Sequence, residues 1–212
     1  MRKAAICIAA LAALGWLFWQ TVQSSLAEPY VIDAGLVSEW TLALRGPAQP
    51  GAGLLVLQPS DQLRAELFQQ IFTRTMESMT SPSVSAMPVV LRSEYRDALG
   101  SVLTPPDVLQ AAEESGVSDA APAPVCIGVV RREGAGTTRQ LYYALFEAPE
   151  VGRFRDALAR RHAEAGGTGR FEPAGFPLVV PIAASDGDFA SWWPLDVSAE
   201  SDCQAPLVTP VS

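Results

Sequence analysis

The sequence predicts an α+β fold in which helices cover mainly one face of a mixed or antiparallel sheet. Short apolar runs are separated by loops that contain glycine and proline, as strands in hairpins are. Longer segments repeat apolar residues at helical spacing behind a capping residue. The order strand, strand, helix, strand occurs twice, which suggests two ββαβ units that share one sheet. The competing interpretation is that a common local order recurs by chance.

The first half of the chain supplies the first unit. Residues 39–44 and 54–57 are apolar runs on either side of a Gly/Pro loop, which is typical of two strands in a hairpin. Ser60 provides a cap for a helix that we expect to continue to the Thr-Ser-Pro sequence at residues 80–82. A strand at residues 87–91 carries its proline near the start, where a missing amide hydrogen is tolerated.

The second half repeats this order behind an additional helix. That helix is expected at residues 104–115, where a threonine cap precedes a proline in the first turn. Strands at residues 125–132 and 140–147 flank a glycine-containing turn, and both are apolar enough to lie inside a sheet. A helix at residues 149–165 ends at two glycines, and a short strand follows at residues 175–181.

These elements divide the chain into four parts. Residues 1–27 form an N-terminal membrane anchor or signal peptide, and residues 28–38 form a neck. Residues 39–183 form the α+β domain, which has an ordinary size for a single hydrophobic core. Residues 184–212 form an acidic C-terminal tail that contains tryptophan.

The N-terminal sequence is typical of a protein exported across a membrane. Arg2 and Lys3 precede an uncharged apolar run at residues 4–19, so the positive-inside rule places the rest of the chain outside the cytoplasm. As a helix this run covers ~24 Å, and a few further residues bring it near the ~30 Å hydrocarbon thickness. Trp16 and Trp19 at its outer end suit the membrane interface. We therefore expect a single-pass transmembrane helix that acts as a signal anchor in the cell membrane, with the C-terminal domain in the periplasm or outside the cell.

A cleaved signal peptide is the alternative. Ser25 and Ala27 are small residues at the positions that precede a cleavage site, so cleavage would leave a secreted protein that begins at Glu28. Hydropathy alone does not separate the two interpretations.

Two cysteines lie beyond the N-terminal run. In an exported domain, Cys126 and Cys203 are expected to form one disulfide that ties the C-terminal tail to a strand. The alternative is a pair of buried free thiols, because sequence alone does not fix the pairing.

Composition and motif content argue against several classes of protein. The formal net charge of −8 disfavours nucleic-acid binding, which needs a basic surface. The single histidine, His162, is expected on a solvated helix end, and no nucleophile motif accompanies it. Metal-ligand spacings and phosphate-binding glycine motifs are missing from the sequence, so we expect no catalytic residues, no metal and no cofactor.

The C-terminal tail places aromatic residues among acidic ones. Phe189, Trp192 and Trp193 lie in a segment with five acids and no basic residue. Aromatic anchors within a polar rim are typical of protein-binding patches, so we expect these three residues to bind a partner. The alternative is that the tail folds back, held by Cys203, and that one of the tryptophans packs on the core.

These expectations combine into a function by elimination and location. We expect a non-enzymatic accessory or interaction subunit of a membrane-associated complex, because an anchor raises the local concentration of a folded domain near membrane partners. Its partners would be membrane protein subunits, with the lipid bilayer contacted through the N-terminal helix and no nucleic acid bound. Two alternatives are a cleaved, soluble exported ligand-binding protein and a carboxylate-based hydrolase, which would need a pocket with two acids at a fixed separation.

Overall fold

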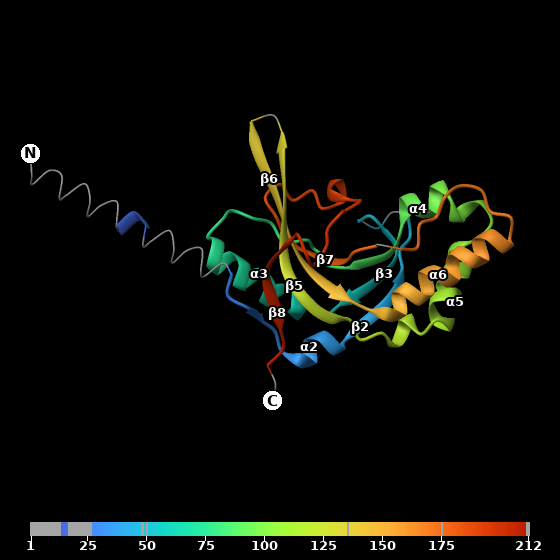
Figure 1. Cartoon of the computed structure of the whole chain (residues 1–212), viewed down its shortest axis with the longest axis horizontal. Coiled ribbons are helices and arrows are strands. Elements are labelled where there is room, and N and C mark those ends of the chain that lie inside the picture. The colour runs from blue at the N-terminus through green and yellow to red at the C-terminus, as the bar shows by residue number, and fades with distance from the viewer. Residues whose placement is uncertain are drawn as a thin grey trace, which may run out of the picture.

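The computed structural model describes residues 14–16, 27–47, 49, 51–134, 136–174 and 176–210. It shows an α+β protein with two sheets (Figure 1). One is a mixed sheet with strand order β1-β8-β5-β6-β7, and the other is an antiparallel sheet with order β2-β3-β4. The strands are β1 (Tyr30–Val31), β2 (Trp40–Leu44), β3 (Gly53–Pro59), β4 (Met87–Leu91), β5 (Ala123–Gly134), β6 (Thr137–Glu147), β7 (Leu178–Ala184) and β8 (Cys203–Val208). The helices are α2 (Ala34–Ser38), α3 (Asp61–Thr75), α4 (Arg92–Asp97), α5 (Pro105–Glu114) and α6 (Pro149–Glu164), with 3-10 turns at Leu99–Ser101, Val117–Asp119 and Ala190–Trp192.

The first unit has the expected order of elements, but its helix is shorter than expected. Strands β2 and β3 pair antiparallel, and the Ser60 hydroxyl caps the first turn of α3. The helix ends at Thr75, because Met76 adopts a left-handed conformation (φ 54°) and donates its amide to the Phe72 carbonyl at 2.8 Å. The predicted continuation to residues 80–82 is wrong, since a residue with positive φ ends a right-handed helix.

Each unit builds its own sheet, so the prediction of one shared sheet is wrong. The last strands of the two units, β4 and β7, lie next to each other. Around them Thr80 and Ala184 exchange two backbone hydrogen bonds at 2.9 Å, and the Ser85 hydroxyl donates to the Pro181 carbonyl at 3.0 Å. The two strands do not form one ladder, and Pro88 in β4 and Pro181 in β7 each lack an amide hydrogen for such pairing.

The second unit is extended by strands from the neck and from the C-terminal segment. Strands β5 and β6 form a long hairpin that projects from the body of the protein (yellow in Figure 1). Strand β8 pairs antiparallel with β5, and β1 pairs parallel with β8. The side-chain amide of Gln70 satisfies the backbone groups at the outer edge of β1. Its oxygen accepts a hydrogen bond from the Val31 amide at 3.2 Å, and its nitrogen donates one to the Val31 carbonyl at 2.7 Å. The neck and the C-terminal segment thus each contribute a strand, β1 and β8, to this sheet.

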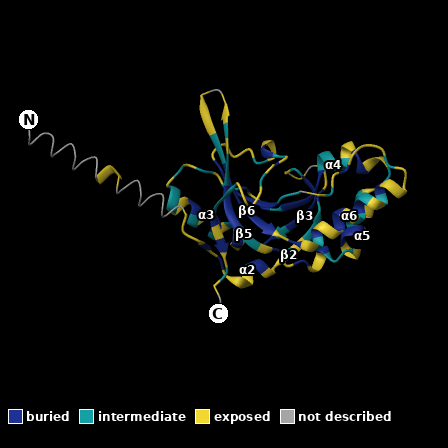
Figure 2. Ribbon diagram, viewed as in Figure 1, coloured by how far each residue is buried: buried dark blue, intermediate teal, exposed yellow. Residues whose placement is uncertain are grey.

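The strands and the inner faces of the helices enclose one main hydrophobic core, with a smaller one beneath the C-terminal segment. In α3, Leu63, Leu67 and Ile71 follow one another at a spacing of about one turn and are completely buried. Figure 2 shows the buried strands inside and the exposed outer faces of α5 and α6. The fold therefore presents its polar faces outward around these two apolar cores.

One arginine is buried where the two units meet. Arg155 of α6 is 1% exposed and forms an ion pair with Glu94 of α4 at 2.6 Å. Its guanidinium also donates to the carbonyls of Val89, Glu172 and Pro173 at 3.0, 2.6 and 3.2 Å. These bonds fasten α6 to β4, to α4 and to the loop that leads into β7.

The N-terminal prediction falls largely outside the described residues. Of the apolar run at residues 4–19, the structure describes residues 14–16, where Trp16 is exposed; Trp19 lies outside the described part. Among the described helices, none is both long and apolar enough to cross a bilayer.

Candidate functional site

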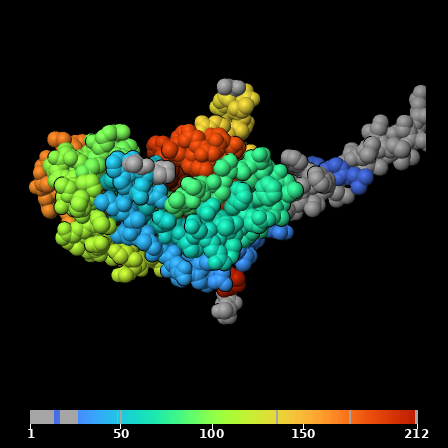
Figure 3. Space-filling view, turned by 180° about the vertical axis from the view of Figure 1, so that it is seen from behind, coloured from blue at the N-terminus to red at the C-terminus, as the bar shows by residue number. Residues whose placement is uncertain are grey.

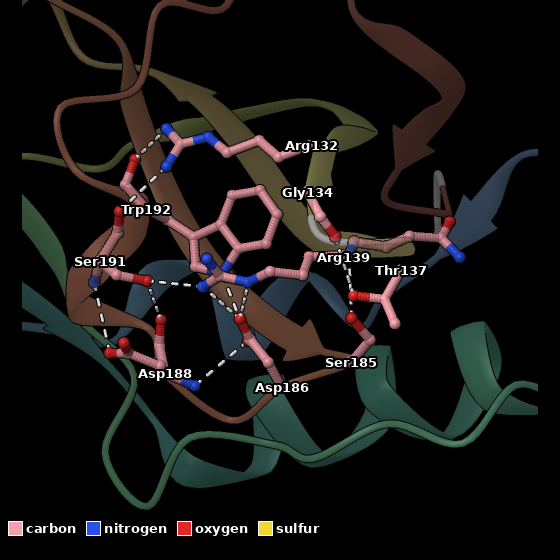
Figure 4. A network of polar contacts seen from close by, with 10 residues as sticks. Arg132, Gly134, Thr137, Arg139, Ser185, Asp186, Asp188, Ser191 and Trp192 are labelled. Carbon is pink, nitrogen blue, oxygen red and sulfur yellow. Dashed lines mark hydrogen bonds and ion pairs between the residues drawn. The ribbon is translucent and has the colours of Figure 1, made fainter.

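Two arginines near the turn of the β5–β6 hairpin hold the C-terminal segment that follows β7 (Figure 4). Arg132 of β5 donates to the carbonyls of Ser191 and Trp192 at 2.9 and 2.8 Å. Arg139 of β6 donates to the Ser191 hydroxyl at 2.7 Å and forms an ion pair with Asp186. Burial by itself would raise the pKa of the Asp186 carboxyl, but hydrogen bonds, led by that from Arg139, lower this pKa overall. These contacts fix the path of the segment.

Trp192 anchors the same segment in the smaller core. Its side chain is completely buried. The guanidinium carbons of Arg132 and Arg139 lie 4.8 and 5.2 Å from the centre of its ring, which is within cation–π range. The segment is therefore held both by its backbone and by its largest side chain.

The predicted disulfide is confirmed. Cys126 of β5 and Cys203 of β8 are bonded, with their Cα atoms 5.7 Å apart. Beside the bond, the Tyr143 hydroxyl donates to the Asp202 carbonyl at 3.3 Å. Burial, and secondarily the charge of Asp202, raises the pKa of Tyr143 to about 12, so the phenol stays a neutral donor near pH 7. The far end of the segment is thus fixed to the sheet as well.

Held at both ends, the segment forms one wall of a groove of about 450 Å³. Phe189 and Trp193, which are both half-buried, lie on this wall. The opposite wall is the loop at residues 80–86 together with the start of β4. In Figure 3 the orange-red C-terminal segment lies beside the green stretch of chain that follows α3. Arg45 and Asp188 are the charged residues among the described lining.

The lining determines what the groove can bind. Most of the remaining lining residues are apolar or carry a small hydroxyl group. Arg45 is buried, and this burial, followed by the nearby charge of Arg92, lowers its pKa. An apolar hollow with one charge of each sign suits an extended peptide segment with apolar side chains better than a phosphate or a nucleic acid.

The structure separates the three aromatic residues that the sequence groups as partner-binding candidates. Phe189 and Trp193 reach the groove, whereas Trp192 points into the core beneath it. The 3-10 turn at Ala190–Trp192 produces this division, because neighbouring residues in a tight turn point in different directions. The burial of Trp192 agrees with the alternative in which a tryptophan of the tail packs on the core.

Sequence reasoning missed the opposite wall of the groove. Residues 80–86 form a serine- and proline-containing loop of ordinary composition. They reach β7, which leads into the C-terminal segment, through contacts such as that of Ser85 with Pro181, which is 96 positions away. The proline pair in β4 and β7 is the sequence feature that could have indicated an unpaired edge there.

His162 corrects a prediction of the sequence analysis. The histidine is buried rather than solvated at the end of α6. Its ring fits against Gly167, where an added Cβ would come within 2.2 Å of the ring. The chain therefore turns back over the imidazole at a position that only glycine fits without displacement.

A second hollow, of about 620 Å³, lies at the start of α6. Glu147 and Asp156 are acids on its lining, and they are the pair that a carboxylate-based hydrolase would need there. Arg155, which also lines this hollow, already forms an ion pair with Glu94. Within the described ranges, no three or more His, Cys, Asp or Glu side chains are grouped so as to hold a metal ion. The aromatic wall makes the first groove the stronger candidate for a binding site.

Comparisons with protein-family models, with curated proteins and with solved structures find no match to this chain.

Proposed function

We propose that this protein is a non-enzymatic accessory subunit of a membrane-associated complex, anchored by its N-terminal segment with its folded domain in the periplasm. We further propose that it binds a segment of a partner membrane protein in the groove beside Phe189 and Trp193. The observation that supports this most directly is a wall with two half-buried aromatic side chains that lines a largely apolar groove.

The fixed position of this wall favours binding. Arg132, Arg139 and the buried Trp192 hold the segment before any partner arrives, so little conformational entropy is lost on binding. Aromatic side chains in partly desolvated hollows contribute a large share of binding energy at protein interfaces. A membrane tether raises the effective concentration of the domain near a membrane partner, which allows a small groove to suffice.

The groove also defines the chemistry of the partner segment. Apolar side chains would pack against Phe189 and Trp193, and a basic group on the segment would pair with the exposed Asp188. A partner segment with a basic residue beside an apolar centre matches this arrangement.

The groove is tested by pull-down from solubilised membranes. We expect Trp193→Ala to reduce recovery of the partner about ten-fold or more, because truncation of an aromatic anchor costs ~2 kcal/mol. Phe189→Ala should act in the same direction. Val208→Ala is the control, since Val208 is a partly exposed apolar residue on β8 that does not line the groove. Equal recovery with Trp193→Ala and with the control would contradict binding in the groove.

The anchor is tested by the intact mass of the native protein in the same preparation. Retention of the N-terminal run in the membrane fraction supports the anchored subunit. A mature chain that begins at Glu28 and occurs free of the membrane would contradict the anchor and would support a soluble exported ligand-binding protein instead.

A further inference from the structure

The neck is fixed to one end of α3. Arg74, in the last turn of α3, donates to the carbonyls of Glu28 and Pro29, the latter at 2.8 Å. The Arg74 guanidinium also lies 3.9 Å from the centre of the Tyr30 ring. The chain that precedes Glu28 therefore leaves the domain at the C-terminal end of this helix.

Apolar side chains are exposed at the same end of the molecule. Met76, which ends α3, is 75% exposed, and Phe72 one turn earlier is 39% exposed. Phe72 stacks on Phe68, which is half-buried against the main core, with the ring centres 6.3 Å apart, so the three residues follow one flank of the helix. The neighbouring Glu77 carboxylate is turned toward the sheet, where Tyr142 and Gln140 donate to it at 3.2 and 3.3 Å.

Met76 occupies its position at a conformational cost. Its φ of 54° lies in the left-handed region, which glycine and asparagine adopt more readily than methionine does. The side chain gains nothing from the core, because it is exposed. Neither the backbone nor the interior therefore favours methionine here, which indicates a contact from outside the domain.

The preceding chain identifies the surface that this end faces. Only nine residue steps separate Trp19, at the outer end of the apolar run, from Glu28. A chain of that length reaches about 30 Å at most, so an anchored chain keeps the end of α3 close to the bilayer. A weak apolar contact with the bilayer is sufficient to dock the tethered domain, because the anchor already holds the domain at a high effective concentration near the lipid.

We infer that Phe68, Phe72 and Met76 form a lipid-docking flank that rests on the outer surface of the bilayer. This inference depends on the proposed anchor and deepens it, because it assigns an orientation to the domain. With α3 against the lipid, α5 and α6 at the other end of the molecule point away from the membrane (Figure 1).

The test uses the full chain in vesicles of phosphatidylcholine that carry a lipid-borne quencher. Cys7→Ala removes the free thiol of the N-terminal run, and Ser78→Cys provides an exposed labelling position two residues after Met76 for an environment-sensitive fluorophore. The matched control is Glu113→Cys, on the exposed side of α5. We expect the quencher to reduce emission at position 78 at least two-fold and to leave position 113 unchanged.

Two further variants separate docking from folding. Phe72→Gln and Met76→Asn, combined with the label at position 78, should abolish the quenching while the protein still floats with the vesicles. Met76→Asn should also raise the midpoint of urea unfolding, since asparagine tolerates a positive φ better than methionine. Loss of docking then cannot be attributed to loss of the fold.

Each other outcome overturns a defined part of the account. A chain that floats with the vesicles but shows no quenching at position 78 overturns the docking flank and leaves the proposed anchor intact. A blue-shifted label that the lipid quencher does not reach shows that another part of the protein covers the flank, which also overturns lipid docking. A chain that does not float overturns the anchor and the docking together.

Discussion

Replacement of Arg155 by methionine is expected to lower the free energy of unfolding by about 3–5 kcal/mol, the cost of removing one partner of a buried ion pair. The Glu94 carboxylate would lose the guanidinium that lies 2.6 Å from it. The carbonyls of Val89, Glu172 and Pro173 would lose a donor as well. Urea unfolding followed by circular dichroism measures the change.

Two comparisons make this prediction specific. Arg153→Met removes an exposed arginine from the same helix, and its pair with Glu150 should contribute less than ~1 kcal/mol. Adding Glu94→Gln to Arg155→Met should recover part of the loss, because it removes the uncompensated charge. If Arg155→Met and Arg153→Met were equally stable, Arg155 would not fasten α6 to β4.

Trp192→Ala is expected to destabilise the protein by about 3–5 kcal/mol, as is usual when a buried aromatic side chain is truncated. The ring is completely buried, and its loss removes the surface on which Arg132 and Arg139 stack. The wall of the groove should then loosen, so partner recovery should fall together with the unfolding midpoint.

The neighbouring tryptophan provides the control for this prediction. Trp193 is half-buried, so Trp193→Ala should cost less than half as much stability as Trp192→Ala while it still weakens partner binding. Equal losses of stability in the two variants would contradict the assignment of Trp192 to the core and of Trp193 to partner binding.

Local features of the fold could be predicted because their causes are local. The helix at Pro105–Glu114 begins where the Thr104 cap and Asp107 bond to each other's backbone, at 2.7 Å for the Thr104 amide and 3.4 Å for the Asp107 amide. The hairpin of β5 and β6 follows from two apolar runs around a glycine turn. In these segments the residues that determine the structure lie within a few positions of one another.

The features that escaped prediction depend on contacts distant in sequence. Strand β8 lies between β1 and β5, which joins both ends of the folded chain in one sheet. No local pattern marks Arg155 as buried, because its partner Glu94 is 61 positions away. The groove has the same origin, since its two walls come from the loop at residues 80–86 and from the C-terminal segment.

The candidate site could be predicted only in part for a related reason. Composition identified Phe189, Trp192 and Trp193 as an aromatic group in an acidic segment. Which of them faces the groove depends on the 3-10 turn and on the positions of Arg132 and Arg139 in the distant hairpin. Sequence therefore located the segment, whereas the structure assigned the direction of each side chain.

Photo-cross-linking in intact membranes tests the central claim most directly. A benzophenone side chain at Val84, an exposed residue on the groove lining, is expected to form an adduct with a membrane protein. The same group at Glu113 on α5 should form none, and Trp193→Ala should remove the adduct from Val84. An adduct that forms equally from both positions, or that persists in Trp193→Ala, would contradict a partner bound in this groove.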